Sequence, residues 1–212
     1  MPIAYVFNKL IRDEMVKLTK PVELSLFMGR NIEDNDNVRS ILKIYEESSN
    51  ELLSIKEVSN PVVSKNYEVN HFPAILFIND KVKEIIRYLA KPFGAEIRPF
   101  VETLTIFSGD KNYYEVVIKE NIEKIKPSII KVMITNSCVY CPEIITFVNK
   151  FAIASNGKIQ SVIIDIMAHS DIAESYDVSS VPYTVINDKK SFIGMVGPEE
   201  VLQELIGGDK IV

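Results

Sequence analysis

Cysteine is scarce in this chain of 212 residues, which contains only Cys138 and Cys141, together with two histidines and no tryptophan. Two cysteines are too few for the disulfide framework of a small secreted scaffold. Lys and Arg form no run and the net charge is −5, which argues against nucleic acid as the main partner. No apolar stretch approaches the roughly 18 residues that a membrane span requires, so we also expect no membrane partner.

The N-terminal segment MPIAYVFNKLIRDEM lacks the features of a targeting signal. Its apolar start is short, is interrupted by Asn8 and Lys9, and is followed by no cleavage-like site. We therefore expect a cytoplasmic protein that begins as written. The composition is otherwise that of a globular protein, with 47% hydrophobic and 25% charged residues, so a core can form without disulfides.

The chain contains an internal repeat. KPVELSLFMGRNIEDNDNVRSIL, which starts at Lys20, resembles KPSIIKVMITNSCVYCPEIITFV, which starts at Lys126. Farther along, EVNHFPAILFINDK resembles DVSSVPYTVINDKK, and each copy places a proline before an apolar strand. The two prolines of a copy are 52 residues apart in the first (Pro21, Pro73) and 55 in the second (Pro127, Pro182). We infer two copies of one domain, residues 1–112 and 113–212, which pack together because the polar junction at 109–112 is short.

Each copy has the same predicted order of elements: helix, strand, helix, strand, a third helix in a short polar segment, a proline, a hairpin and a closing helix. The predicted elements of the first copy are 8–18, 22–27, a helix through Val38, Ile41, Leu42 and Tyr45, then 52–58, the hairpin 74–80 with 84–89, and 96–104. Those of the second copy are 115–125, 129–134, a helix through Ile144, Ile145, Val148, Phe151 and Ala152, then 160–166, the hairpin 183–188 with 191–196, and 198–206. This order predicts an α/β protein in which each copy has a mixed central sheet with helices on both faces.

A Cys-x-x-Cys between a strand and a helix, a proline before a later strand and a duplicated domain together resemble the thioredoxin fold. The duplication is similar to the archaeal protein disulfide oxidoreductases, also described as glutaredoxin-like, which are two fused thioredoxin-fold units of about this length. The N-terminal unit of the bacterial peroxiredoxin-reducing flavoprotein is also such a pair. The resemblance covers nearly the whole chain. It implies an enzyme that exchanges protein disulfides or thiols without a cofactor, with a thioredoxin-reductase-like flavoprotein as electron partner.

Two departures from the family pattern stand out. Counted from the Lys-Pro landmark, Cys138 and Cys141 fall opposite Ile32 and Asn35, so the first unit is predicted to be redox-inactive. Thioredoxins also place a buried acid about six residues before the first cysteine, and here that position holds Val132. Proton transfer during exchange must then use another group or water.

The spacing of the two cysteines assigns them different roles. Cys138 is expected at a helix N-terminus, where free backbone N–H groups and the helix dipole lower the pKa of a thiol, so we predict it as the attacking thiolate. Cys141, one helical turn further in and more buried, is predicted to resolve the mixed disulfide. Val139 and Tyr140 lie between them and are expected to control access and to contact substrate.

The resemblance also implies that Pro182 is cis and faces Cys138. A cis bond would leave the backbone of Val181 free to pair with an extended substrate strand. We expect Pro142 in the first helical turn, where a missing N–H costs little.

Other readings of the cysteine pair are half of a zinc site, a cluster shared between two chains, and an inert buried pair. Zinc requires four ligands, and neither histidine has ligand-like spacing to the pair. We expect no metal site. His71 is interpreted as a solvated loop residue and His169 as a surface residue.

Two further clusters receive structural interpretations. The acidic run from Glu33 to Asp36 is predicted to cap a helix, since Asp and Asn satisfy free N–H groups and favour the dipole. Tyr113 and Tyr114 are predicted to pack at the junction of the copies.

The alternative function is a redox-inert, client-binding or chaperone-like module with a structural disulfide. It is favoured by the loss of cysteines from the first unit, which persists without chemistry of its own. Oxidant, reductant and isomerase share the same residues, so all three directions remain open.

Overall fold

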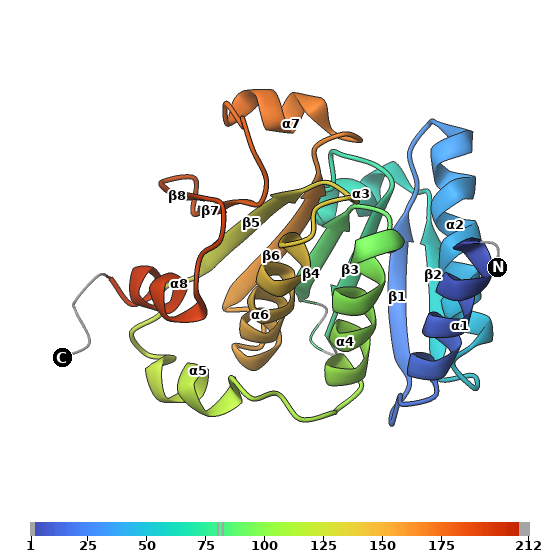
Figure 1. Cartoon of the computed structure of the whole chain (residues 1–212), viewed down its shortest axis with the longest axis horizontal. Coiled ribbons are helices and arrows are strands. Elements are labelled where there is room, and N and C mark those ends of the chain that lie inside the picture. Colours follow the sequence, from blue (N-terminus) through green and yellow to red (C-terminus); the bar gives the residue numbers. More distant parts are fainter. Residues whose placement is uncertain (1–2, 80, 82, 208–212) are drawn as a thin grey trace.

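The computed structural model describes residues 3–79, 81 and 83–207. Asp80 and Val82, in the first predicted hairpin, lie outside the described residues. The strands are β1 (Val22–Phe27), β2 (Leu53–Val58), β3 (Ala74–Ile78), β4 (Glu84–Leu89), β5 (Ser128–Ile134), β6 (Ile159–Asp165), β7 (Tyr183–Ile186) and β8 (Lys190–Ile193). They form one eight-stranded sheet in the order β2-β1-β3-β4-β6-β5-β7-β8 (Figure 1).

Eight α-helices flank the sheet in the described residues. They are α1 (Ile3–Met15), α2 (Ile32–Glu47), α3 (Pro61–Asn66), α4 (Ile97–Phe107), α5 (Glu115–Asn121), α6 (Cys141–Ala154), α7 (Ser170–Ser175) and α8 (Pro198–Leu205). A 3-10 turn, η1 (Gly94–Glu96), precedes α4. The predicted order included a third helix before the hairpin, and α3 lies at that position. That helix begins with Pro61 in its first turn and is capped by the side chain of Asn60, which accepts from the Val62 N–H.

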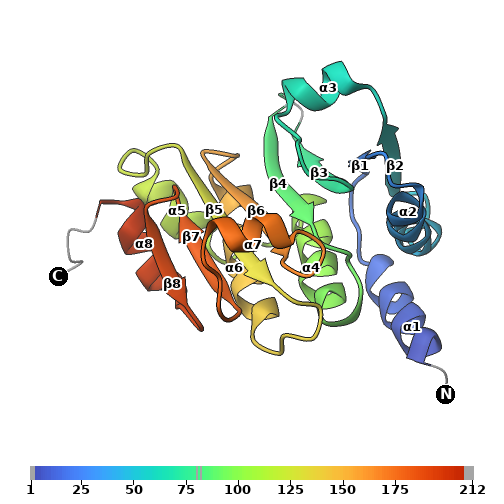
Figure 2. The same ribbon diagram turned by 90° about the horizontal axis from the view of Figure 1, so that it is seen from above.

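The same strand order occurs in the first half (α1 to α4) and in the second half (α5 to α8). In each half the first strand pairs parallel with the second and antiparallel with the third, and the third pairs antiparallel with the fourth. β4 then pairs parallel with β6, which joins the halves into one continuous sheet. Figure 2 shows this succession of strands from β8 at the left to β2 at the right. The predicted mixed sheet is confirmed.

Helices cover both faces of the sheet, as predicted. The larger hydrophobic core lies under α1, α2, α4, α6 and α8 and runs through both halves. A smaller core lies on the opposite face, where residues of α3 and α7 pack over the strands. The two halves therefore share one interior, with α4 packed directly against α6.

A buried polar network also connects the halves. The Asn149 amide on α6 donates to the Tyr88 hydroxyl at 2.7 Å and to the Thr103 hydroxyl at 2.9 Å. The Ser161 hydroxyl on β6 donates to the Asn149 side-chain oxygen at 2.6 Å. All four side chains are buried. One amide therefore contacts polar groups from β4, α4 and β6. The Thr103 hydroxyl also donates to the Pro99 carbonyl, but the Tyr88 and Ser161 hydroxyls would lie unpaired in a low-dielectric interior without Asn149.

Replacing Asn149 with Ala is expected to lower the free energy of unfolding by about 3 kcal/mol, because it leaves buried hydroxyls on both halves without a partner. The measurement is the midpoint of urea unfolding. Asn121→Ala is the matched control, since its amide makes only a local bond to the Val117 carbonyl. Equal midpoints for the two variants would contradict a connecting role for the network.

Candidate functional site

The two cysteines lie where β5 leads into α6. After β5 the chain forms a tight loop, in which the Cys138 N–H donates to the Thr135 carbonyl at 3.0 Å, and α6 then begins at Cys141. The sulfurs of Cys138 and Cys141 form a disulfide, with 5.5 Å between the Cα atoms. Pro142 lies in the first turn of α6, as predicted.

The two sulfurs have different environments. Cys141 is fully buried, whereas Cys138 retains 9% of its exposure. The Cys141 N–H donates to the Cys138 sulfur at 3.1 Å. This N–H belongs to the helix N-terminus, where backbone donors and the helix dipole stabilise an anion. In the reduced protein, the same donor would stabilise a thiolate on the more accessible cysteine.

The side chains beside the disulfide are open to solvent. Val139 is 82% exposed and Tyr140 is 64% exposed, which leaves two large apolar surfaces next to Cys138. The Val181–Pro182 peptide bond is cis, as predicted. Within the described residues, the N–H and carbonyl of Val181 make no hydrogen bond.

A buried carboxyl group comes from the first half. Val132, at the position of the thioredoxin acid, is fully buried in β5. Glu96, in η1, is also fully buried, and neither of its carboxyl oxygens has a hydrogen-bond partner in the described structure. Burial, with a further contribution from the Asp165 carboxylate, raises the pKa of Glu96 to about 8.

Glu96 lies close to the loop that carries the disulfide. A side chain at Gly94, also in η1, would begin 3.4 Å from the Asn136 carbonyl oxygen, two residues before Cys138. Asp165 pairs in register with Ile134, the last residue of β5. The first half thus places a buried carboxyl group near the loop that carries the disulfide. The sequence indicated only the start of a helix here, and no local signal marks the residue, because its role depends on the contact between halves.

The corresponding place in the first half has no redox chemistry. Strand registers beside the two cis prolines (Phe72–Pro73 and Val181–Pro182) align Phe27 with Met133, and counting on from this pair without a gap places Cys138 and Cys141 opposite Ile32 and Asn35. The helix nevertheless begins at Ile32 in the first half and only at Cys141 in the second. The Asn35 amide donates to the Gly29 carbonyl at 2.9 Å, and its oxygen accepts from the Gly29 N–H at 3.0 Å. Hydrogen bonds thus hold the turn that a disulfide holds in the second half.

The cap of α2 differs from the prediction. Asn31, rather than a residue of the acidic run 33–36, is the N-cap, and its side chain accepts from the Asp34 N–H. Glu33 and Asp34 occupy the first turn, where negative charge suits the helix dipole.

The prediction for His169 as a surface residue is wrong. Its exposure is only 8%, because the start of α7 packs against the first half, where the His71 ring lies 5.7 Å away. Burial, and then the neighbouring His71, lower the pKa of His169. His71 lies in a loop and stays partly exposed, as predicted, and its Nε2 lies 2.8 Å from an Asp171 carboxylate oxygen.

The two tyrosines at the junction of the halves have different environments. Tyr114 packs on Phe151 of α6, with 5.1 Å between ring centroids, as expected for junction packing. Tyr113 is 74% exposed, so the prediction is wrong for this residue. Its ring faces solvent under the Lys111 ammonium group.

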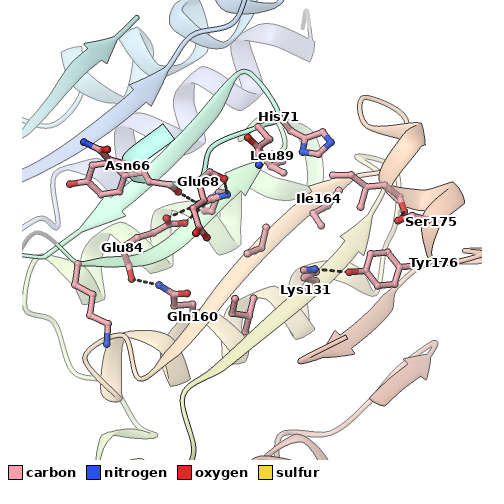
Figure 3. Close-up of a pocket in the computed structure, with 17 residues that line it drawn as sticks. Asn66, Glu68, His71, Glu84, Leu89, Lys131, Gln160, Ile164, Ser175 and Tyr176 are labelled. Atoms are coloured by element: carbon pink, nitrogen blue, oxygen red, sulfur yellow. Dashed lines mark hydrogen bonds and ion pairs between the residues drawn. The ribbon is translucent and has the colours of Figure 1, made fainter. Parts of the chain in front are cut away.

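Two cavities lie on opposite faces of the molecule. One, of about 450 Å³, is lined by Val139 and Pro142 of the disulfide motif together with residues of α4. The other, of about 780 Å³, lies over β4, β5 and β6 between α3 and α7, and neither cysteine lines it. In this cavity the Lys131 ammonium group donates a hydrogen bond to the Tyr176 hydroxyl, and the Gln160 amide donates one to the Glu84 backbone carbonyl (Figure 3). Neither cysteine lines the first cavity either, but Val139 and Pro142 do, so of these two cavities only the first adjoins the disulfide motif.

Two further structural features concern metals and membranes. Across residues 3–79, 81 and 83–207, no group of three or more His, Cys, Asp or Glu side chains is arranged to hold a metal ion. None of the helices described in that part of the chain has the length and apolar character needed to cross a bilayer.

Comparison with known proteins supports the fold. Residues 129–207 match the family described as thioredoxin domain. The chain is similar to a protein disulfide oxidoreductase from Aeropyrum pernix k1, with a TM-score of 0.85 and 25% identity over 97% of this chain and 93% of that one. None of the curated proteins matches the sequence.

Two more solved structures share the fold. The NTD_N/C domain of alkylhydroperoxide reductase AhpF from Enterococcus faecalis has a TM-score of 0.83 and 18% identity, over 95% of this chain and 98% of that one. Sso1120 from Sulfolobus solfataricus has a TM-score of 0.64 and 17% identity, over 90% and 99%. The predicted resemblance is confirmed: the fold is thioredoxin-like along nearly the whole chain, and the chain resembles thioredoxin-fold disulfide oxidoreductases.

Proposed function

We propose that this protein is a protein disulfide oxidoreductase with one active site, formed by Cys138 and Cys141. The observation that carries the proposal is the asymmetry of the pair: Cys138 keeps 9% of its exposure and its sulfur accepts a helix N-terminal N–H, whereas Cys141 is fully buried. We further propose two thioredoxin-like units, residues 1–112 and 113–212, of which the first lacks redox cysteines and serves packing or substrate binding. The site requires no cofactor.

The reaction on a substrate disulfide has two steps. The Cys138 thiolate attacks one substrate sulfur, forming a mixed disulfide and releasing the other sulfur as a thiolate, which takes a proton from water. Cys141 then loses its proton and attacks the Cys138 sulfur. The second step forms the Cys138–Cys141 disulfide and releases the remaining substrate sulfur. The remaining substrate sulfur also leaves as a thiolate. The protein loses two electrons and the Cys141 proton, and the substrate gains the two electrons as two thiolates, which take up that proton and one from water.

Glu96 has the properties that the second step demands. Cys141 is fully buried, so its thiol has no direct contact with bulk water to receive its proton. A neighbouring carboxyl group with a pKa of about 8 takes and returns protons near neutral pH. We propose that the ionised Glu96 accepts the Cys141 proton, and that the protonated form returns it when the reaction runs in the other direction.

Substrate binding is assigned to residues around Cys138. The exposed Val139 and Tyr140 offer apolar contacts to the polypeptide that carries the disulfide. The unpaired backbone of Val181, next to Pro182, offers hydrogen bonds to an extended strand. The proposed substrates are proteins with disulfides or thiols, and the proposed electron partner is a thioredoxin-reductase-like flavoprotein. A cytoplasmic location stays a prediction of the sequence.

The alternative remains a redox-inert client-binding module with a structural disulfide. The exposed apolar side chains Ile32 and Met167 favour some binding by the surface outside the disulfide site. Truncation to residues 113–212 is a poor test, because it would expose the β6 edge and remove Glu96. A redox measurement on the full chain separates the two functions.

The reduction potential of the Cys138–Cys141 pair is expected between about −120 and −270 mV, the span of known dithiol oxidoreductases. The protein is equilibrated in glutathione buffers, and free thiols are trapped and counted by mass spectrometry. A value near the upper end indicates an oxidant or isomerase, and one near the lower end a reductant. A potential below about −300 mV with slow exchange would mark a structural disulfide and favour the alternative.

A further inference from the structure

The cavity of about 450 Å³ that Val139 and Pro142 line has walls from both halves, and it adjoins the disulfide motif although neither cysteine lines it. One wall is α6, from Val139 and Pro142 at the motif to Lys150 further along the helix. The facing wall is α4 of the first half, which contributes Arg98 and Glu102. Val139 follows Cys138 and lines this cavity. Substrate side chains that flank a disulfide bound at Cys138 can therefore enter the cavity and contact residues of the first half.

Arg98 is the cavity residue whose charge has no partner in the described structure. It is exposed in the first turn of α4, where the helix dipole disfavours a cation. Its natural i,i+4 partner, Glu102, pairs instead with Lys150 across the cavity. In the described structure Arg98 makes no hydrogen bond or ion pair, and its guanidinium group is free to meet a ligand.

The other free charge in the cavity has a structural explanation. Glu143 lies in the first turn of α6, where the helix N-terminus stabilises a carboxylate. Glu102 and Lys150 neutralise each other. The position of Arg98 near the motif is set by η1, because Gly94 abuts the Asn136 carbonyl just before Cys138. The first half thus presents one unpaired cation to whatever occupies the cavity next to Val139, the residue that follows Cys138.

We propose that Arg98 is a specificity-determining residue, which selects protein substrates that carry an Asp or Glu close to the cysteine under attack. The inference rests on the proposed function and deepens it, since it assigns the redox-inactive half a role in substrate choice. The side chain acts by attraction across a partly enclosed cavity, and its planar fork is suited to a carboxylate. It takes no part in the thiol chemistry.

The test uses the reduced full-length protein in single turnovers with three disulfide-linked peptide dimers, which carry Glu, Gln or Lys beside the cysteine. Acid quenching and mass spectrometry give the rate of peptide thiol release. The wild type is expected to react about fivefold faster with the Glu peptide than with the Lys peptide, the range of one exposed ion pair. Arg98→Glu is expected to reverse this preference, and high salt to reduce it.

Two controls separate the inference from its premises. Lys124→Glu makes the same charge change at an exposed residue that does not line the cavity, and should leave the wild-type preference unchanged. The neutral reagent hydroxyethyl disulfide should react equally with all variants. An unchanged Glu-to-Lys preference in Arg98→Glu would overturn the role of Arg98. Failure of the wild type to cleave hydroxyethyl disulfide would overturn the proposed function itself.

Discussion

Cys138→Ser is expected to abolish disulfide exchange, with a loss on the order of 10³-fold or more in the rate of insulin reduction, because a hydroxyl group cannot replace the attacking thiolate. Cys141→Ser is expected to react once and then stop. Its Cys138 still attacks, but no second thiol resolves the product, so the variant accumulates as a mixed disulfide whose added mass equals that of the substrate chain.

The two variants control for each other, because each removes the same disulfide and one sulfur atom. A loss of activity through misfolding would affect both, whereas only Cys141→Ser should trap substrate. Mass spectrometry after incubation with reduced-and-reoxidised insulin chains measures the trapped species. Full insulin-reducing activity in Cys138→Ser would contradict the proposed oxidoreductase function. A mixed disulfide formed by Cys138→Ser through Cys141 would show that Cys141 is the attacking thiol and Cys138 the resolving one.

Glu96→Gln is expected to slow exchange on the order of 10²-fold at pH 7 to 8, because the amide cannot accept the Cys141 proton. In the wild type the rate of the resolving step should rise with pH through an apparent pKa near 8, that of Glu96. The variant should lose this inflection. Glu143→Gln, which removes an exposed carboxylate beside the same motif, is the matched control and should keep it.

The same substitution has an effect on stability whose sign follows from the raised pKa. Between pH 4.5 and about 8, Glu96 is protonated in the folded protein and ionised in the unfolded chain. The free energy of unfolding contributed by this group therefore falls as pH rises through that window and levels off above it. The full change has an upper limit on the order of 5 kcal/mol.

Glu96→Gln should accordingly unfold at higher urea concentration than the wild type at pH 9, and the difference should vanish towards pH 4. Urea titrations of both proteins across this range measure it. A wild-type stability that is independent of Glu96 at every pH would show that the carboxyl group is not buried in solution. Such a result would leave the proton acceptor of Cys141 without a candidate.

The sequence by itself determined the local elements and the repeat. Apolar periodicity located the strands and most helices, since side chains alternate in a strand and recur every 3 to 4 residues in a helix. Counting from the Lys-Pro landmarks placed Asn35 opposite Cys141, and the strand registers, which align Phe27 with Met133, agree with that count. The spacing of the cysteines was sufficient to propose the chemistry, because Cys-x-x-Cys at a helix start is a local arrangement.

Only the tertiary structure decided which residues of the two halves contact each other. The pairing of β4 with β6 merges two sheets into one, and it places η1 and α4 against the disulfide loop. Glu96, Arg98 and His169 each looked ordinary in sequence: a helix start, a helix surface and a loop. Their buried or facing positions arise from contacts between residues more than 30 positions apart, and periodicity within a single element carries no information about which other element will cover it.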